Sequence, residues 1–237
     1  MMTNSNRYIL FYKPYGVVSA FTDRDGHTTL KSFIPLPNVY PVGRLDLDSE
    51  GLLFLCDDGP LAHRMTSPEY EHPKTYLVQV EGEVPEAKIA ELEAGVEIKG
   101  KRTRRCKVLQ IPEPELVDRG KPVTPHGPTT WLRIVLYEGR KRQIRHMTAA
   151  VGFPTLRILR VAIGPLSLSD LKPGEWRELT QKEIDLLRQS VKQKPASRGR
   201  TPEASPGNTG ESQYQNAGRR SPARGNHPSD VNGPKRK

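Results

Sequence analysis

The sequence predicts an α+β domain whose core is an antiparallel or mixed sheet with helices at its periphery. Three observations support this fold class. Segments with strand character dominate the first 191 residues, hairpin-like turns join them in place of regular crossover helices, and the phosphate-binding patterns G-x-G-x-x-G and G-x-x-x-x-G-K-[ST] do not occur in the sequence. The last observation also disfavours a nucleotide-hydrolysing protein.

Four strands are expected, at residues 7–13, 51–56, 74–82 and 129–139. In the third, Tyr76, Val78 and Val80 fall on one face, with the period of two that a strand has. The fourth alternates in the same way, with Leu132 and Leu136 on one side. Alternation of this kind indicates that both segments are strands.

Four helices are expected: from Asp58 to Pro68, over residues 85–95, over residues 142–151, and from Thr180 to Val191. Asp58 can cap the first of them, because Gly59 and Pro60 follow it in the first turn. Thr180 and Glu183 have the spacing of a capping box for the last.

The helix expected over residues 142–151 has two different faces. Ile144, Met147 and Val151 recur at helical spacing on an apolar face. The opposite face carries Arg142, Arg145, His146 and Ala149. One side of this helix is therefore basic and the other suited to a core.

Charge divides the 237-residue chain into two parts. Residues 192–237 contain no Leu, Ile, Phe, Met or Trp, and ten Lys or Arg face three acids there, which is +7 of the chain's +10. Such a segment cannot bury enough apolar area to fold, so we expect a disordered basic tail after one catalytic domain over residues 1–191. Acid-free basic clusters at 99–107 and 139–145 add to the tail and favour a polyanionic partner, nucleic acid above all.

The cysteines and the hydropathy of the sequence indicate the cellular compartment of the protein. Cys56 and Cys106 have no C-x-x-C partner, and the histidines show no metal-ligand spacing, so neither a disulfide framework nor a zinc site is expected. No signal peptide and no membrane-spanning run is found. We expect a cytoplasmic protein.

A cluster of carboxylates, Asp46, Asp48 and Glu50, lies between Arg44 and an apolar run at residues 51–56. Carboxylates at the end of a buried strand are costly to desolvate, so at least one of the three is expected to have a functional role. The spacing approaches a calcium-binding loop, but the breakers before it and the apolar run within it disfavour that site. Asp48 and Glu50 are expected to be turn and solvated residues, with Arg44 as their surface partner.

Three motifs make Asp46 different from its neighbours. G-R-L-D-x-D-S-E-G-L-L at 43–53, K-T-Y-x-V at 74–78 and E-G-R-K-R-Q-I-R at 138–145 resemble the signature of the RsuA/RluB/E/F family of ribosomal RNA pseudouridine synthases. The resemblance continues through G-F-P-T-L-R at 152–157, R-x-x-I-G-P-L at 160–166 and L-K-P-G-E-W-R-E-L-T at 171–180. It spans about residues 7–190 and is nearest to members that lack an N-terminal S4 module and modify the large subunit.

The resemblance implies the pseudouridine synthase fold with a central active-site cleft, and an isomerase that converts one specific uridine of ribosomal RNA, 23S rRNA being favoured, without a cofactor. It implies Asp46 as the catalytic carboxylate, Tyr76 as the aromatic residue packed on the uracil and Arg145 as the basic residue that pairs with Asp46. Sugar and phosphate contacts are expected from Arg44, Lys74, Arg140, Lys141, Arg142 and His146. His146 replaces a frequent second arginine, so binding is expected to depend weakly on pH.

Several alternatives stay open at the level of sequence. Asp46 could attack the sugar, attack the base or take a ribose proton, because all three schemes need the same ionised oxygen. A non-catalytic RNA-binding or ribosome-assembly protein with this fold is the rival class. Within the enzymes, the target could be a uridine of small-subunit or transfer RNA. A cleft enzyme of this size can act as a monomer.

Overall fold

The computed structural model describes residues 6–192. The expected basic tail lies outside the described residues, apart from Lys192 at its start. No helix in residues 6–192 is long and apolar enough to cross a membrane.

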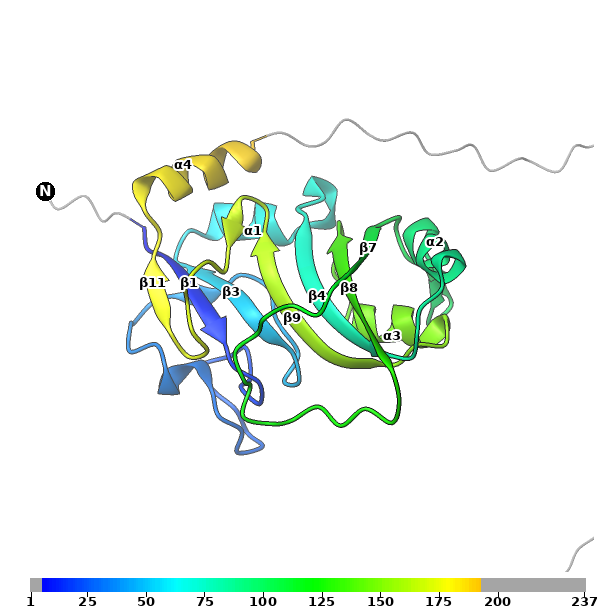
Figure 1. Ribbon diagram of the computed structural model, residues 1–237. Helices are drawn as coiled ribbons and strands as arrows, with labels where there is room; N and C mark the ends of the chain where they lie inside the picture. Colours follow the sequence, from blue (N-terminus) through cyan, green and yellow to red (C-terminus); the bar gives the residue numbers. More distant parts are fainter. Residues whose placement is uncertain (1–5, 193–237) are drawn as a thin grey trace, which may run out of the picture. The chain divides into compact units, whose positions relative to one another are not determined.

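One large sheet organises the described chain (Figure 1). Along its main path the strands are β11 (Trp176–Glu178), β1 (Tyr8–Lys13), β3 (Glu50–Cys56), β9 (Thr155–Ile163), β4 (Lys74–Glu81), β8 (Thr129–Leu136) and β7 (Lys107–Ile111). The short strands β2 (Tyr40–Pro41) and β10 (Leu166–Ser167) pair with β3 and β9, and β5 (Glu97–Ile98) with β6 (Lys101–Arg102) forms a separate two-stranded sheet. β3 and β9 run parallel and the other pairs antiparallel, which confirms the mixed sheet.

The four expected helices are present as α1 (Gly59–Thr66), α2 (Glu86–Ala94), α3 (Gln143–Ala150) and α4 (Gln181–Ser190), and two 3-10 turns cover Leu30–Ser32 and Pro68–Tyr70. Asp58 caps α1 by accepting a hydrogen bond from the Leu61 amide at 3.0 Å. The capping box of Thr180 and Glu183 at the start of α4 is formed as predicted. Local sequence signals therefore set where α1 and α4 begin.

The strand β9 was not expected from the sequence, although it lies at the centre of the sheet. Its segment T-L-R-I-L-R-V-A-I contains Arg157 and Arg160, which interrupt the apolar pattern, and both arginines are buried. β9 pairs with β3 on one side and with β4 on the other. It thus joins β3 and β4, and both of these strands lie far from it in the chain.

Each half of the sheet has its own core. Residues of β4 and β8 pack with α2 and α3, for example Val78 and Leu132 against Leu92 and Met147. The apolar face predicted for α3 is buried, whereas the β1 and β3 half packs with α1 and α4. A long connection, residues 112–128, leaves β7 and crosses in front of the sheet before it enters β8 (Figure 1).

Candidate active site

A cavity of about 520 Å³ opens over β4 and β9, between the end of α1 and the start of α3. Its wall includes seven of the nine residues for which the sequence predicted catalytic or RNA-binding roles: Arg44, Asp46, Lys74, Tyr76, Arg140, Lys141 and Arg142. Arg145 and His146, one turn into α3, do not line it. Motifs separated by about 100 residues in the sequence therefore meet at one cavity.

The loop before β3 carries Asp46 and is held at several points. The buried Ser19 hydroxyl donates to the Leu45 carbonyl at 2.8 Å and accepts from the Leu45 amide at 3.0 Å. The Gly16 amide donates to the Leu47 carbonyl at 2.9 Å. These contacts fix the backbone on both sides of Asp46, so its half-buried side chain is presented to the cavity by a rigid loop.

Tyr76 lies on β4 directly beside β9. Its Cα is in register with Arg160 of β9 and with Ile134 of β8. Ile158 and Leu136 complete an apolar surface around the ring in the cavity wall. An aromatic side chain on a strand in the cavity wall can serve as a platform on which a planar base stacks.

Arg145 does not pair with Asp46, contrary to the prediction. Its Nε lies 3.2 Å from Asp48 Oδ2, an ion pair that is not aligned as a hydrogen bond, and its Nη2 donates to the Asp48 carbonyl at 3.0 Å. Nη1 donates to the Thr155 carbonyl at 3.1 Å. The sequence could not distinguish the two aspartates because they lie two positions apart on one turn.

Asp48 is also not the solvated turn residue that was expected. Arg142 donates two hydrogen bonds to its carboxylate, at 3.0 and 2.9 Å. Burial alone would raise the pKa of Asp48, but the hydrogen bonds from Arg142 and the charges of Arg145 and Arg142 lower it overall. Asp48 therefore stays ionised and ties the start of α3 to the Asp46 loop.

Asp46 itself is left without such a partner. Within residues 6–192 its carboxylate forms no ion pair and no side-chain hydrogen bond, and Arg44, the expected surface partner, forms no ion pair either. Its charge nevertheless acts on Lys13, Arg142 and Arg145. A carboxylate surrounded by cations but bonded to none of them is available to a substrate.

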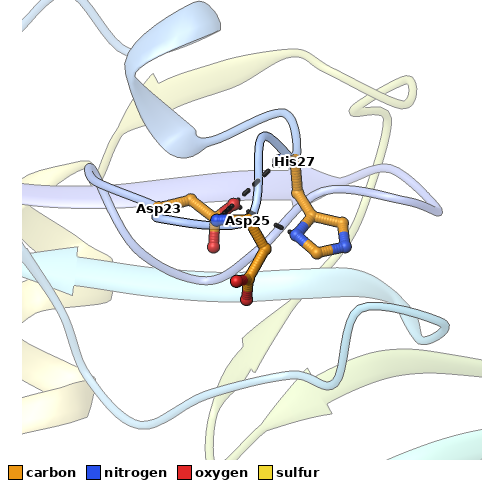
Figure 2. A group of neighbouring side chains, drawn as sticks. All are labelled: Asp23, Asp25 and His27. Atoms are coloured by element: carbon orange, nitrogen blue, oxygen red, sulfur yellow. Dashed lines mark hydrogen bonds and ion pairs between the residues drawn. The ribbon is translucent and has the colours of Figure 1, made fainter.

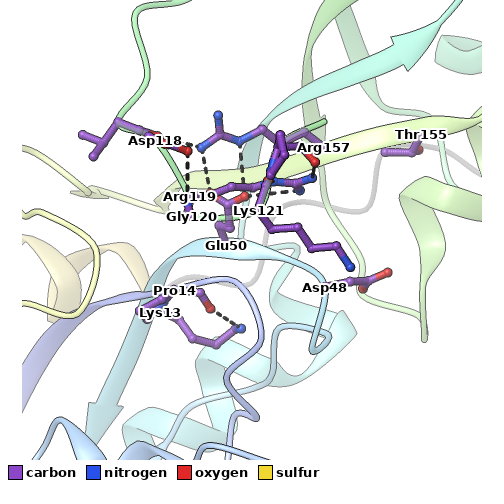
Figure 3. A network of polar contacts seen from close by, with 12 residues as sticks. Lys13, Pro14, Asp48, Glu50, Asp118, Arg119, Gly120, Lys121, Thr155 and Arg157 are labelled. Atoms are coloured by element: carbon purple, nitrogen blue, oxygen red, sulfur yellow. Dashed lines mark hydrogen bonds and ion pairs between the residues drawn. The ribbon is translucent and has the colours of Figure 1, made fainter. Parts of the chain in front are cut away.

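Glu50 was expected to be solvated, yet it is 1% exposed. Arg157 donates to both its oxygens, at 3.2 and 2.8 Å, and Arg119 Nη1 lies 3.7 Å away (Figure 3). Arg119 comes from the 112–128 connection and also lies over the Tyr15 ring, 4.7 Å from its centroid. Burial of a charged group requires such pairing, and here the pairing anchors the long connection to the start of β3.

Two lysines near the cavity have lowered pKa values. Burial lowers the pKa of the fully buried Lys13 to about 8, although Glu50, Asp48 and Asp46 oppose the shift. Lys13 Nζ donates to the carbonyls of Pro14 and Val17. Burial and then the charge of Arg160 lower the pKa of Lys74 to about 8. Of these two lysines, Lys74 lines the cavity and Lys13 does not.

The remaining predicted RNA contacts differ in availability. Arg44 and Lys141 are exposed at the cavity. Arg140 is engaged in the fold, because its guanidinium contacts Glu138 and donates to the carbonyls of Lys101 and Arg102. His146 lies partly buried on α3, with Nε2 unpaired in the described chain. Free cationic groups are thus concentrated at the mouth of the cavity.

Arg160 is the cavity residue that the sequence analysis missed. It belongs to the R-x-x-I-G-P-L motif at 160–166, but a role could not be assigned to it without the strand β9. Its Nε donates to the Leu52 carbonyl at 2.8 Å. Gly51 allows this approach of β3 and β9, since a Cβ at that position would lie 2.3 Å from the Arg160 carbonyl oxygen.

One cluster of possible metal ligands lies away from the cavity. Asp23, Asp25 and His27 share an exposed loop (Figure 2). Asp23 accepts hydrogen bonds from the amides of Asp25 and His27 and contacts the His27 ring at 3.0 Å. These contacts account for the cluster as a turn stabilised by an aspartate side chain.

Comparisons with known proteins agree on one family. The model of the family described as RNA pseudouridylate synthase matches residues 7–150. The chain is 49% identical to the ribosomal large subunit pseudouridine synthase E of Vibrio vulnificus over 176 residues, 73% of this chain and 75% of that protein. It is 50% identical to the protein of the same name from Xanthomonas campestris pv. campestris, over 71% of this chain and 93% of the relative. A crystal structure of a pseudouridylate synthase superposes with a TM-score of 0.64 and 32% identity, covering 79% of this chain and 76% of that one.

Proposed function

Since this chain belongs to the RNA pseudouridylate synthase family, we propose that Asp46 is the carboxylate with which it converts one specific uridine to pseudouridine. The protein is a pseudouridine synthase of large-subunit (23S) ribosomal RNA. The cavity wall that brings Asp46 and Tyr76 together is the observation that carries the assignment of Asp46.

The reaction needs little from outside the substrate. The bond from ribose C1′ to uracil N1 breaks, the freed base turns, and C1′ joins C5; C5 loses a proton and N1 gains one. No electrons and no external group are taken up. The protein must therefore supply an ionised oxygen, a closed cavity that retains the base, and groups that hold the nucleotide.

Asp46 supplies the oxygen in each of the three possible routes. Its carboxylate stays free for the substrate because Asp48 engages Arg142 and Arg145. Those two arginines still place positive charge near it. Arg145 acts in this scheme by positioning the loop through Asp48, not by contacting Asp46.

Tyr76 is the platform for the base. A uridine inside an RNA helix cannot reach the cavity, so the target is unpaired or flipped out of its stack. Stacking on an aromatic side chain is worth about 1 to 3 kcal/mol. Arg44, Lys141 and Lys74 line the cavity, and this supports the proposal that they contact the phosphates and sugars around the flipped nucleotide.

Release of tritium from ribosomal RNA labelled at uridine C5 tests the assignment. The wild type should release tritium, and Asp46→Asn should bind the RNA with similar affinity but release none. Asp25→Asn, which removes an exposed aspartate that does not line the cavity, should behave as the wild type. RNA binding without tritium release by the wild type would favour the non-catalytic RNA-binding class.

The specific uridine is found by mapping modified positions in ribosomal RNA from a strain that lacks the protein. A missing pseudouridine in large-subunit RNA is expected, and a missing one only in small-subunit or transfer RNA would contradict the proposal. We further propose that the enzyme acts in the cytoplasm as a monomer, with residues 1–191 as the catalytic domain. Sedimentation of the free protein checks the monomer.

A further inference from the structure

Arg160 is a buried cation in the cavity wall that the mechanism above does not use. The residue is 3% exposed, and its Nη2 finds no hydrogen-bond partner among the described residues. No carboxylate in residues 6–192 forms an ion pair with it. A buried guanidinium with a free donor is costly unless it meets an acceptor, so the substrate is expected to provide one.

The position of Arg160 relative to Tyr76 indicates which part of the substrate this is. The two residues are cross-strand partners of β9 and β4, and both line the cavity. Side chains of such partners on one face of a sheet lie about 5 Å apart at Cβ. A uracil stacked on Tyr76 would therefore have its polar edge within reach of the guanidinium.

Phosphate is the less suitable acceptor. A phosphate of the RNA backbone stays at the cavity mouth, where the exposed Arg44 and Lys141 lie, whereas Arg160 is almost fully buried. The base is the part of a flipped nucleotide that enters deepest. The acceptors on its edge are the carbonyl oxygens O2 and O4.

We propose that Arg160 donates a hydrogen bond to a carbonyl oxygen of the uracil and stabilises the negative charge that the ring acquires during the reaction. This inference rests on the proposed function. When the bond from C1′ breaks, its electron pair goes to N1, and the ring shares the charge with O2 and O4. A donor fixed in advance where charge develops lowers the barrier more than it strengthens ground-state binding.

Lys74 supports this arrangement from the same face of β4. It lies two residues before Tyr76 and lines the cavity, and after burial the charge of Arg160 contributes to lowering its pKa. Its Nζ donates to the His72 carbonyl at 3.2 Å. The inner part of the cavity is thus electropositive before substrate enters, as a site for an anionic base requires.

The test compares two RNA substrates, large-subunit ribosomal RNA transcribed with uridine and the same RNA transcribed with 5-fluorouridine. Fluorine at C5 withdraws electrons, so it stabilises the uracil anion without help from the protein. A fluorinated C5 has no proton to lose, so the last step that yields pseudouridine is open only to the uridine RNA. The single-turnover rate at which the N-nucleoside disappears, which reports cleavage of the bond from C1′ to N1, is therefore followed for both RNAs by chromatography of the digested RNA. Arg160→Gln keeps a donor for Leu52 but removes the charge, and Arg133→Gln on the outer face of β8 is the matched control.

Arg160→Gln should lower the rate on uridine RNA about 100-fold and change RNA affinity less than threefold. The ratio of the rate on 5-fluorouridine RNA to the rate on uridine RNA should be about tenfold higher in Arg160→Gln than in the wild type. In Arg133→Gln this ratio should equal that of the wild type. An unchanged ratio, or a loss that is seen only in affinity as for a phosphate contact, would overturn the inference. If Arg160→Gln does not fold, Arg160→Met, which also removes the charge, is measured by the same ratio, and a ratio equal to that of the wild type overturns the inference.

The outcomes separate the two proposals. Conversion of neither RNA by the wild type would refute the proposed function, and the inference with it. Conversion by the wild type with an unchanged ratio in the Arg160 variant refutes the inference alone.

Discussion

Asp46 and Asp48 lie two residues apart on one loop, yet their surroundings separate their roles. Asp48 accepts hydrogen bonds from Arg142 and forms an ion pair with Arg145. Asp46 lines the cavity, and its carboxylate has no bonded partner among the described residues. A carboxylate that is saturated by two guanidinium groups is poorly suited to attack or to take a proton. Asp48 is therefore a positioning residue for the loop that carries Asp46.

Asp48→Asn should accordingly impair chemistry rather than binding. Loss of the charge releases Arg142 and Arg145, so the Asp46 loop and α3 lose their link, and misplacement by about 1 Å can cost about 100-fold in rate. RNA affinity should stay the same or increase slightly, because a negative charge is removed. Single-turnover rates and RNA titrations check this. Arg145→Met breaks the same link and should lower the rate likewise, and an unaltered rate in both variants would show that the link is dispensable.

Lys74 predicts an alkaline limit to activity. Its pKa of about 8, lowered first by burial and then by Arg160, means that the side chain is charged below pH 8 and becomes neutral above it. The rate should therefore fall as the pH rises through 8. Lys74→Arg should remain active to higher pH, because arginine keeps its charge. A profile of single-turnover rate against pH checks this prediction. If the rate of Lys74→Arg still falls above pH 8, the fall comes from another group such as Lys13, whose pKa is also about 8.

At the scale of elements, β9 depends on a close approach to β3. Gly51 has a φ of +104°, and its missing side chain leaves room for the backbone of Arg160. The helices α1 and α4 begin with side-chain caps instead, and α4 has a complete capping box. The contact between β3 and β9 therefore predicts a loss of stability on substitution of Gly51, whereas the cap of α4 predicts a stability that depends on pH.

Gly51→Ala should be strongly destabilising. The added Cβ would meet the Arg160 carbonyl oxygen, and overpacking and a strained backbone together cost about 3 kcal/mol or more. Gly26→Ala is the control, since Gly26 has a φ of +79° but no atom within 4 Å of the added Cβ. It should cost only the backbone strain, about 1 to 2 kcal/mol. Urea unfolding compares the two, and equal losses would contradict the close-contact argument.

Glu183 predicts a pH-dependent contribution to the stability of α4. Hydrogen bonds from Arg177 lower its pKa to about 2, so the folded state favours the ionised form. The stabilisation is complete above the ordinary pKa of about 4.5 and is lost as the pH falls toward 2. Glu183→Gln should cost about 1 kcal/mol at pH 7, as other cap losses do. Urea unfolding should show a smaller difference at pH 3, and a difference independent of pH would argue against this contribution.

At the scale of the whole molecule, positive charge is distributed unequally along the chain. Residues 192–237 hold +7 of the net +10, outside the part that the structure describes. The residues that line the cavity, by contrast, fall between positions 42 and 163. Attraction to RNA and choice of the uridine should therefore be separable.

Truncation after Val191 should weaken RNA binding at low salt and leave the modified position unchanged. The tail would contribute through counterion release, so the difference between full-length and truncated protein should shrink between about 50 and about 300 mM salt. RNA titrations at both concentrations and mapping of the modified uridine check the two parts. Equal affinity at low salt would exclude a contribution of the tail.

The sequence by itself determined the features that depend on neighbouring residues. The four helices, their caps and the alternating strands follow from local patterns, and the three motifs indicated the family and Asp46. Only the tertiary structure decided the strand β9, the burial of Glu50 and the partner of Arg145. Arg145 and Asp48 are 97 positions apart, and Arg157 and Glu50 are 107 apart. Such pairs depend on how β9 joins the two halves of the sheet, and no local pattern in the sequence specifies that contact.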